Sequence, residues 1–239
     1  MKKTLLFIFI ISYTTIFCQE TEKKSPVSGK FDLGLNYTKN KEEIFQFNNV
    51  SQIKYETKNK IVLFSSKVSF INKTGEEELI NKGTQDLKYS FKTKKINSNI
   101  SVQHLYDISR SVKRRWNTGV GFSINIIKNE SKDINFGLTG LREKETTILL
   151  EEKLKNRMEN SVIFSLQLNK NIQIQGFTKY LPNIQDFNDY RLDNTFSIRI
   201  NLNPKFLLSI NNTLNYDNLP EDGVNKTDYQ LINSVSYTF

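Results

Sequence analysis

Apolar and polar residues alternate along this chain with a period of two, from about residue 29 to the last residue. The final segment shows the pattern well, because Tyr229, Leu231, Val235 and Tyr237 share one parity while polar residues fill most of the other. Successive side chains of a β-strand point to opposite faces, so this period is typical of strands that lie between two different environments. The pattern predicts an all-β chain.

About twelve such segments can be drawn. Short connections between them fall at 57–60, 93–95, 128–132, 170–171 and 203–204, and longer, more charged ones at 39–43, 73–82, 107–114, 143–156, 182–188 and 218–225. Short turns on one side and long loops on the other are typical of bacterial outer-membrane barrels. We therefore predict one transmembrane, antiparallel, up-and-down β-barrel of about twelve strands over residues 29–239, with both termini on the short-turn side.

One stretch, residues 143–156, leaves two possibilities open. Ile148, Leu149, Leu150 and Leu154 lie there among charged residues. The segment is either an extension of two strands above the membrane or a short amphipathic helix in a loop.

The composition agrees with a barrel although it looks too polar for a membrane protein. Hydrophobic residues make up 37% of the chain, and the mean hydropathy is −0.49. In a transmembrane barrel only alternate residues meet lipid, so the average hydropathy stays low. A soluble β-sandwich or lipocalin-like barrel is the alternative. Aromatic residues near the expected strand ends favour the membrane barrel, and they are Tyr37, Tyr55, Phe70, Phe91, Tyr106, Trp116, Tyr180 and Tyr216.

The N-terminus has the features of a signal peptide. Lys2 and Lys3 precede an apolar stretch at residues 5–17. We predict a signal peptide over 1–18, cleavage before Gln19, a short periplasmic segment over 19–28, and an outer-membrane location. Cys18 is the one cysteine of the chain, so the mature protein has no disulfide. A lipidated Cys18 is the rival reading, which the bulky residue before it disfavours.

Several short motifs resemble a known family. They are Thr118-Gly119-Val120-Gly121, Tyr180-Leu181-Pro182, Asp189-Tyr190-Arg191, Tyr216-Asp217, Lys226-Thr227-Asp228 and the terminal Ser236-Tyr237-Thr238-Phe239. Their arrangement resembles the salt-induced outer-membrane protein family (YdiY-like, domain of unknown function 481), over about residues 30–239. The resemblance implies an outer-membrane β-barrel with no assigned activity. Phe239 and Tyr237 also look like the assembly signal that the barrel-assembly machinery recognises.

Charged residues gather near the predicted long loops. The cluster comprises Asp107, Arg110, Arg114, Arg115, Arg142, Asp189, Arg191, Asp217, Lys226 and Asp228. Three interpretations stay open: ion pairs that narrow the outer mouth, a basic patch for lipopolysaccharide phosphates or an anionic permeant, or solvated loops. The net charge of +9 does not indicate nucleic-acid binding, because no aromatic–basic recognition module accompanies it.

His104 is the one histidine, so any histidine-dependent hydrolysis must use it. Its parity places it on the lipid side near the outer rim, where an interfacial polar residue is the better explanation. With no second histidine and no cysteine in the mature chain, we predict no transition-metal site and no cofactor.

These observations predict a non-enzymatic outer-membrane barrel, either a narrow pore for ions or small solutes or an envelope-stress barrel related to salt. The alternatives are a structural or surface-binding barrel with charged extracellular loops, and a lipid-modifying enzyme that uses His104. The expected partners are outer-membrane lipid, lipopolysaccharide and, during insertion, the barrel-assembly machinery, with a monomer favoured.

Overall fold

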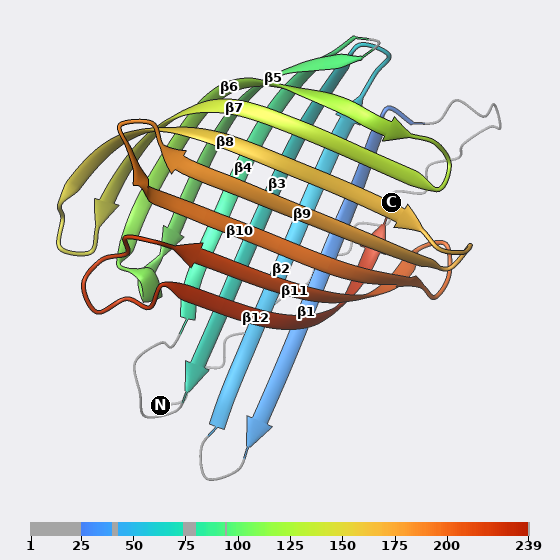
Figure 1. The fold of residues 1–239 in the computed structure, drawn as a ribbon. Coiled ribbons are helices and arrows are strands. Elements are labelled where there is room, and N and C mark those ends of the chain that lie inside the picture. The colour runs from blue at the N-terminus through green and yellow to red at the C-terminus, as the bar shows by residue number, and fades with distance from the viewer. Residues whose placement is uncertain (1–24, 40–42, 74–79, 94, 239) are drawn as a thin grey trace.

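The computed structural model describes residues 25–39, 43–73, 80–93 and 95–238. These residues form twelve antiparallel strands in a closed barrel, in which each strand pairs with its neighbours in sequence (Figure 1). The strands are β1 (Val27–Lys39), β2 (Glu43–Glu56), β3 (Lys60–Lys73), β4 (Ile80–Lys92), β5 (Ile96–Asp107), β6 (Val112–Lys128), β7 (Lys132–Thr147), β8 (Glu152–Gln167), β9 (Ile172–Asn183), β10 (Asp186–Asn201), β11 (Phe206–Asp217) and β12 (Thr227–Thr238), with a 3₁₀ turn η1 (Ile108–Arg110) before β6. The predicted fold class is confirmed.

The two faces of the barrel wall differ in polarity as the alternation requires. On the outer face, Leu35 and Val120 are 64% and 65% exposed. On the inner face, Asp32 and Asn117 are buried. An apolar outside around a polar inside is the arrangement of barrels that lie in lipid, and it is the reverse of a lipocalin-like barrel.

The lumen is filled by polar side chains. Among the described residues, the buried apolar set is limited to Val112, Leu141 and Leu181, while the buried polar set is much larger. Pairs such as Ser197–Asn211, whose Oγ and Oδ1 atoms are 2.8 Å apart, hold neighbouring strands through their side chains. The interior is therefore organised by hydrogen bonds and ion pairs, which a low dielectric strengthens.

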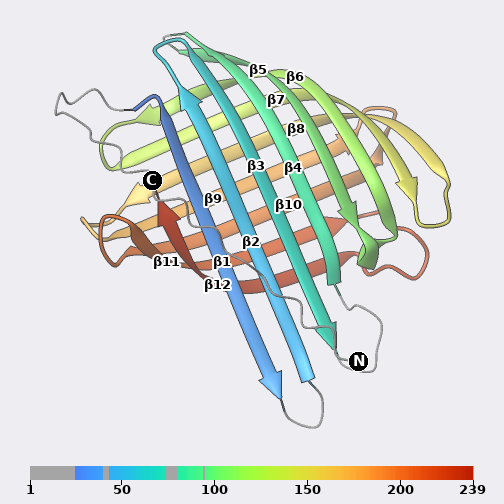
Figure 2. The ribbon, with the colours of Figure 1, turned by 180° about the vertical axis from the view of Figure 1, so that it is seen from behind.

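The first six strands form one wall of the barrel and the last six form the opposite wall (Figures 1 and 2). The strands are strongly staggered, as closure of a barrel requires. A row of paired inward residues shows this stagger: it starts at Lys30, near the beginning of β1, and runs through Gln52, Ser65, Asp86, Gln103 and Asn117 to Glu143, near the end of β7. Because the strands are tilted, this row of directly paired residues rises from one end of the barrel toward the other as it passes from β1 to β7.

The connections divide between two ends, which we call the turn end and the loop end. At the turn end, Asn129, Asn169 and Asn203 each accept hydrogen bonds from the backbone N–H groups that follow them, at 2.8–3.1 Å. Such Asx turns reverse the chain in few residues. The same local chemistry therefore makes three of the short turns. As predicted, β1 begins at the turn end and β12 ends there.

The loop end is less loop-like than the sequence predicted. The segment 143–156 extends two strands: β7 continues to Thr147 and β8 begins at Glu152. Between them Leu150 takes a left-handed φ of 66°, and its N–H donates to the Thr147 carbonyl at 3.0 Å. At 143–156 the first of the two open alternatives is thus correct. The expected long connection at 182–188 is wrong, because β9 reaches Asn183 and β10 begins at Asp186.

β1 and β12 close the barrel along a short seam. Their register runs from Lys30 opposite Thr238 to Leu33 opposite Val235. The two strands diverge toward the loop end (Figures 1 and 2). The described part of this seam is shorter than the other strand pairings.

The predicted signal peptide and Phe239 lie outside the described residues. Within the described part of the chain, no helix is long and apolar enough to cross a membrane.

Gly121 permits close contact between β6 and β7. A Cβ atom on Gly121 would overlap the Leu138 carbonyl oxygen and the Thr139 side chain, whereas one on Gly140 would have its nearest neighbour, the Val120 carbonyl oxygen, at 3.9 Å. We predict that Gly121→Ala lowers the free energy of unfolding by about 1–3 kcal/mol, because the two strands must move apart. Denaturant unfolding in detergent micelles measures the change. Gly140→Ala is the matched control, and an equal effect of both substitutions would contradict the prediction.

Candidate functional site

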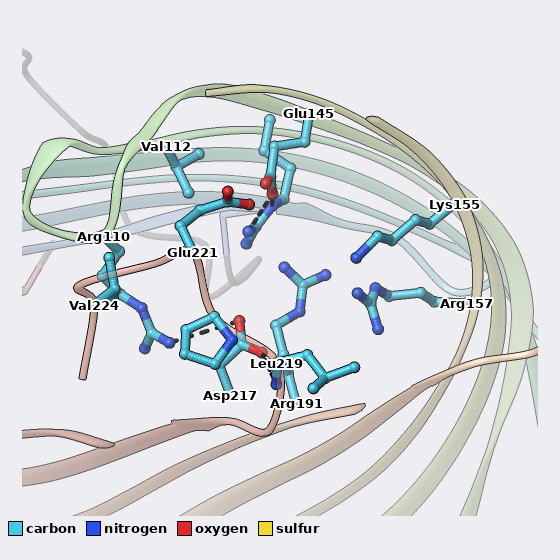
Figure 3. Close-up of a pocket in the computed structure, with 12 residues that line it drawn as sticks. Arg110, Val112, Glu145, Lys155, Arg157, Arg191, Asp217, Leu219, Glu221 and Val224 are labelled. Carbon is cyan, nitrogen blue, oxygen red and sulfur yellow. Dashed lines mark hydrogen bonds and ion pairs between the residues drawn. The ribbon is translucent and has the colours of Figure 1, made fainter. Parts of the chain in front are cut away.

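Charged side chains from several strands meet in the lumen at the loop end (Figure 3). They come from η1, from β6, β7, β8, β10 and β11, and from the 218–226 connection. The cluster, called the mouth network below, consists of Arg110, Arg115, Glu143, Glu145, Lys153, Lys155, Arg157, Asp189, Arg191, Asp217 and Glu221. The cavity left inside it measures about 20 Å³, which holds about one water molecule.

Glu143 lies at the centre of the mouth network. Its side chain is 2% exposed. Arg157 Nε donates to Glu143 Oε1 at 3.2 Å, and Arg191 donates to Oε2. Arg115 Nε lies 3.9 Å from Oε2. Three guanidinium groups thus surround one carboxylate, which supplies the pairing that a buried charge needs.

Arg157 joins four strands through its guanidinium group. Besides its bond to Glu143, it donates to the carbonyl oxygens of Leu181 and Asp189, both at 3.1 Å. A further nitrogen donates to Asp189 Oδ1 at 2.8 Å, and Lys155 Nζ lies 2.7 Å from Asp189 Oδ2. Because the guanidinium group of Arg157 connects β7, β8, β9 and β10, it fixes the relative positions of these strands at the loop end.

A second layer of ion pairs lies around this centre. Arg115 pairs with Glu145, its direct neighbour across β6 and β7. Arg110 of η1 lies 3.6 Å from Asp217 at the end of β11. The second pair connects η1, which leads into β6, with the opposite wall of the barrel.

The 218–226 connection folds over the mouth network. Asn218 anchors it to β10, since its backbone N–H donates to the Tyr190 carbonyl at 3.0 Å and its Nδ2 donates to the Asn188 carbonyl at 2.8 Å. Glu221 pairs with Lys153 on β8, and Pro220 lines the cavity. The connection therefore covers one side of the mouth network.

Charged groups outside the mouth network also interact inside the barrel. Lys82 on β4 and Asp228 on β12 are 2.6 Å apart, although three strands separate β4 from β12 around the wall. Lys179 on β9 lies 3.0 Å from Glu159 and interacts electrostatically with Asp86 on the opposite wall. The walls are thus close enough for their charged groups to interact directly.

The charged residues selected from the sequence take different places. Five of them belong to the mouth network, and Asp228 belongs to the separate ion pair with Lys82. The five are Arg110, Arg115, Asp189, Arg191 and Asp217.

The others do not join it. Asp107 is buried and accepts a hydrogen bond from Ser109 Oγ at 2.6 Å. Lys226 is exposed in the connection before β12. Arg114 and Arg142 lie on the outer face, because neighbours in a strand point to opposite faces and Arg115 takes the inward position.

Sequence reasoning missed Glu143, Glu145, Lys155 and Arg157, which form the centre of the mouth network. Glu143, Glu145 and Lys155 lie in the segment whose conformation was left open between strand and helix, and Arg157 follows it directly. Once it is a strand, Glu143 and Glu145 share the inward parity with Leu141, and Arg157 follows from the pairing of β7 with β8. The alternation that marks these residues as inward-facing is present in the sequence, but it can be used only once the segment is assigned as strand.

His104 lies on the outer face. Its Nδ1 is 2.8 Å from Gln85 Oε1, and its ring centre is 4.7 Å from that of Trp116. The hydrogen-bond partner that the structure gives it is thus an amide rather than a serine hydroxyl. Tyr237 also faces outward and packs against Phe206, with ring centres 5.4 Å apart. Within the described residues, no group of three or more histidine, cysteine or acidic side chains is arranged to hold a metal ion.

Substitution of Glu143 tests how much the mouth network contributes to the free energy of unfolding. We predict that Glu143→Gln lowers the free energy of unfolding by about 3 kcal/mol, because it leaves buried guanidinium groups without their shared carboxylate. Glu152→Gln is the matched control. Glu152 pairs with Lys144 on the outer face, where both side chains are more than half exposed, so the loss is about 0.5 kcal/mol or less. Denaturant unfolding followed by Trp116 fluorescence measures both; equal losses would show that the network does not stabilise the barrel.

Solved barrels resemble the fold at low sequence identity. The NanC porin has a TM-score of 0.49 at 12% identity, covering 89% of this chain and 96% of the porin. The KdgM porin in complex with disordered oligogalacturonate has a TM-score of 0.47 at 9% identity, covering 89% and 99%. An anion-selective porin from Comamonas acidovorans has a TM-score of 0.44 at 7% identity, covering 89% and 98%.

A search of curated proteins finds no match to this sequence. The family model described as "Protein of unknown function, DUF481" matches residues 31–239, so the chain belongs to the DUF481 family.

Proposed function

We propose that this protein is a non-enzymatic outer-membrane barrel that forms a narrow, restricted path for ions or small solutes. The observation that carries the proposal is a polar, charged lumen enclosed by a wall whose outer face is apolar. A wall of this kind is stable in lipid, and its charged interior provides sites that small ions can visit.

The orientation follows from the connections. The turn end, with the barrel's first and last strands, faces the periplasm, and the loop end with the mouth network faces the cell exterior. The N-terminal signal directs export, and the final strand, with Tyr237 on its outer face, presents the barrel-assembly machinery with its recognition signal. We take the inserted protein to be a monomer.

The mouth network restricts passage. The cavity among its side chains measures about 20 Å³, about the volume of one water molecule, and this small free space supports a restricted path rather than a wide pore. The same observation favours a second candidate function, a structural barrel that never conducts.

A higher salt concentration weakens the ion pairs that hold the 218–226 connection over the mouth network. The Debye length falls from about 10 Å at 0.1 M to about 3 Å at 1 M salt, so partly exposed ion pairs weaken as salt rises. The pairs Arg110–Asp217 and Lys153–Glu221 are partly exposed, whereas the Glu143–Arg157 pair is buried. This difference supports a salt-related role in which the 218–226 connection is released while the centre persists.

Substitution of Glu221 tests whether the 218–226 connection restricts the passage of ions. We predict that Glu221→Gln increases single-channel conductance in planar bilayers at 0.1 M salt by about twofold or more, because it removes the charge that holds the connection to Lys153. Replacing residues 219–224 by two glycines should increase it further. Glu152→Gln, which removes an ion pair on the outer face of the same end, should leave the conductance unchanged. If neither wild type nor the shortened variant conducts, although both migrate as folded barrels, the structural function is correct and the pore is excluded.

A further inference from the structure

The outer face of β6 and β7 has a group of cations near the loop end. Arg114, Arg142 and Lys144 are all exposed. The pairing of the two strands places Arg114 opposite Thr146, Lys144 opposite Trp116 and Arg142 opposite Thr118. Directly paired residues point to the same face, so the three cations lie beside one another on the outside of the wall.

The aromatic neighbours fix the depth of this group. Trp116 is 46% exposed, and its ring packs against His104, which packs in turn against Tyr106. Tryptophan and tyrosine in such a position are typical of the boundary between hydrocarbon and headgroups. Toward the turn end, the outer face becomes apolar at Val120 and Phe122. The cations therefore lie at the level of lipid headgroups.

Two of the three cations have no acidic partner among the described residues. Arg114 Nε donates to Thr146 Oγ1 at 3.2 Å, and an Arg142 nitrogen donates to Asn156 Oδ1 at 2.9 Å. Lys144, by contrast, lies 3.1 Å from Glu152. Two guanidinium groups thus keep most of their donors free toward the lipid, and a guanidinium fork matches phosphate oxygens well.

An arginine on the lipid-facing side of a barrel is unfavourable in the hydrocarbon, and this cost falls near the interface. An anionic headgroup beside Arg114 and Arg142 converts the remaining cost into a favourable contact, since each cation near an anionic surface adds to lipid affinity. Leu154, which lies opposite Lys144 on β8 and is 56% exposed, provides an apolar contact beside the charges.

We propose that Arg114 and Arg142 form a binding site for the phosphate groups of lipopolysaccharide on the outer face of β6 and β7. The proposal rests on the orientation given above, in which the loop end lies in the outer leaflet, where this phosphorylated glycolipid supplies the negative charge. It does not depend on whether the lumen conducts. The site orients the barrel by holding one sector of its wall to the outer leaflet.

Binding of defined lipids to the folded barrel in detergent micelles tests the site. Native mass spectrometry compares lipopolysaccharide, enzymatically dephosphorylated lipopolysaccharide and phosphatidylglycerol. We expect the double variant Arg114→Gln, Arg142→Gln to bind lipopolysaccharide about tenfold more weakly than wild type, and dephosphorylation of the lipid to have a similar effect on wild type.

The double variant Lys58→Gln, Lys60→Gln is the matched control, because it removes two exposed cations at the turn end. It should bind lipopolysaccharide as wild type does. Heat-modifiable migration on gels shows whether each variant is folded, and Arg114→Gln alone, expected to have a smaller effect, replaces the double variant if that one does not fold. Unchanged binding by the folded arginine variant, or equal binding of phosphatidylglycerol by wild type, would overturn the proposal. Failure of the conductance measurements would leave this result unaffected.

Discussion

A closed antiparallel wall with a two-residue side-chain period is the constraint on which the structure depends. Closure pairs the backbone groups of each strand with those of its neighbours, so the barrel needs no water at its edges. The period then sends every second side chain into a narrow lumen, whatever its charge. In this chain those positions include many acidic and basic residues. The free-energy cost of burying their charges is offset only where groups of opposite charge pair with each other. The ion pairs across the lumen are a consequence of that geometry.

The mouth network meets this requirement in a layered way. Its centre is buried: Glu143 is held by guanidinium groups, and Arg157 also satisfies backbone carbonyls of β9 and β10. Its outer layer is more exposed and includes Glu221 on a connection rather than on a strand. A buried centre resists salt and solvent, whereas an exposed layer responds to them. The same set of charges can therefore stabilise the wall and control access to it.

Sequence reasoning predicted the wall well because each strand can be judged from its own alternation. The outward position of His104 and the strand order needed no long-range information. The centre of the mouth network could not be found in this way. Glu143 meets Arg191 because of the stagger between strands 48 residues apart in sequence, and no local pattern carries that stagger. The choice between strand extension and helix at 143–156 stayed open for a related reason, since its apolar residues Ile148, Leu149 and Leu150 form a tip rather than a face.

The pairing of β1 with β12 differs from the other strand pairings of the barrel in its length. β6 and β7 are paired along almost their whole length, with two shifts of register, whereas β1 and β12 are paired from Lys30 to Leu33 in the described residues. Lateral tension in a closed wall is carried by the hydrogen bonds between strands, and it is greatest per bond where the bonds are fewest. Among the described residues, the mechanically weakest line of the wall therefore lies between the first strand and the last strand.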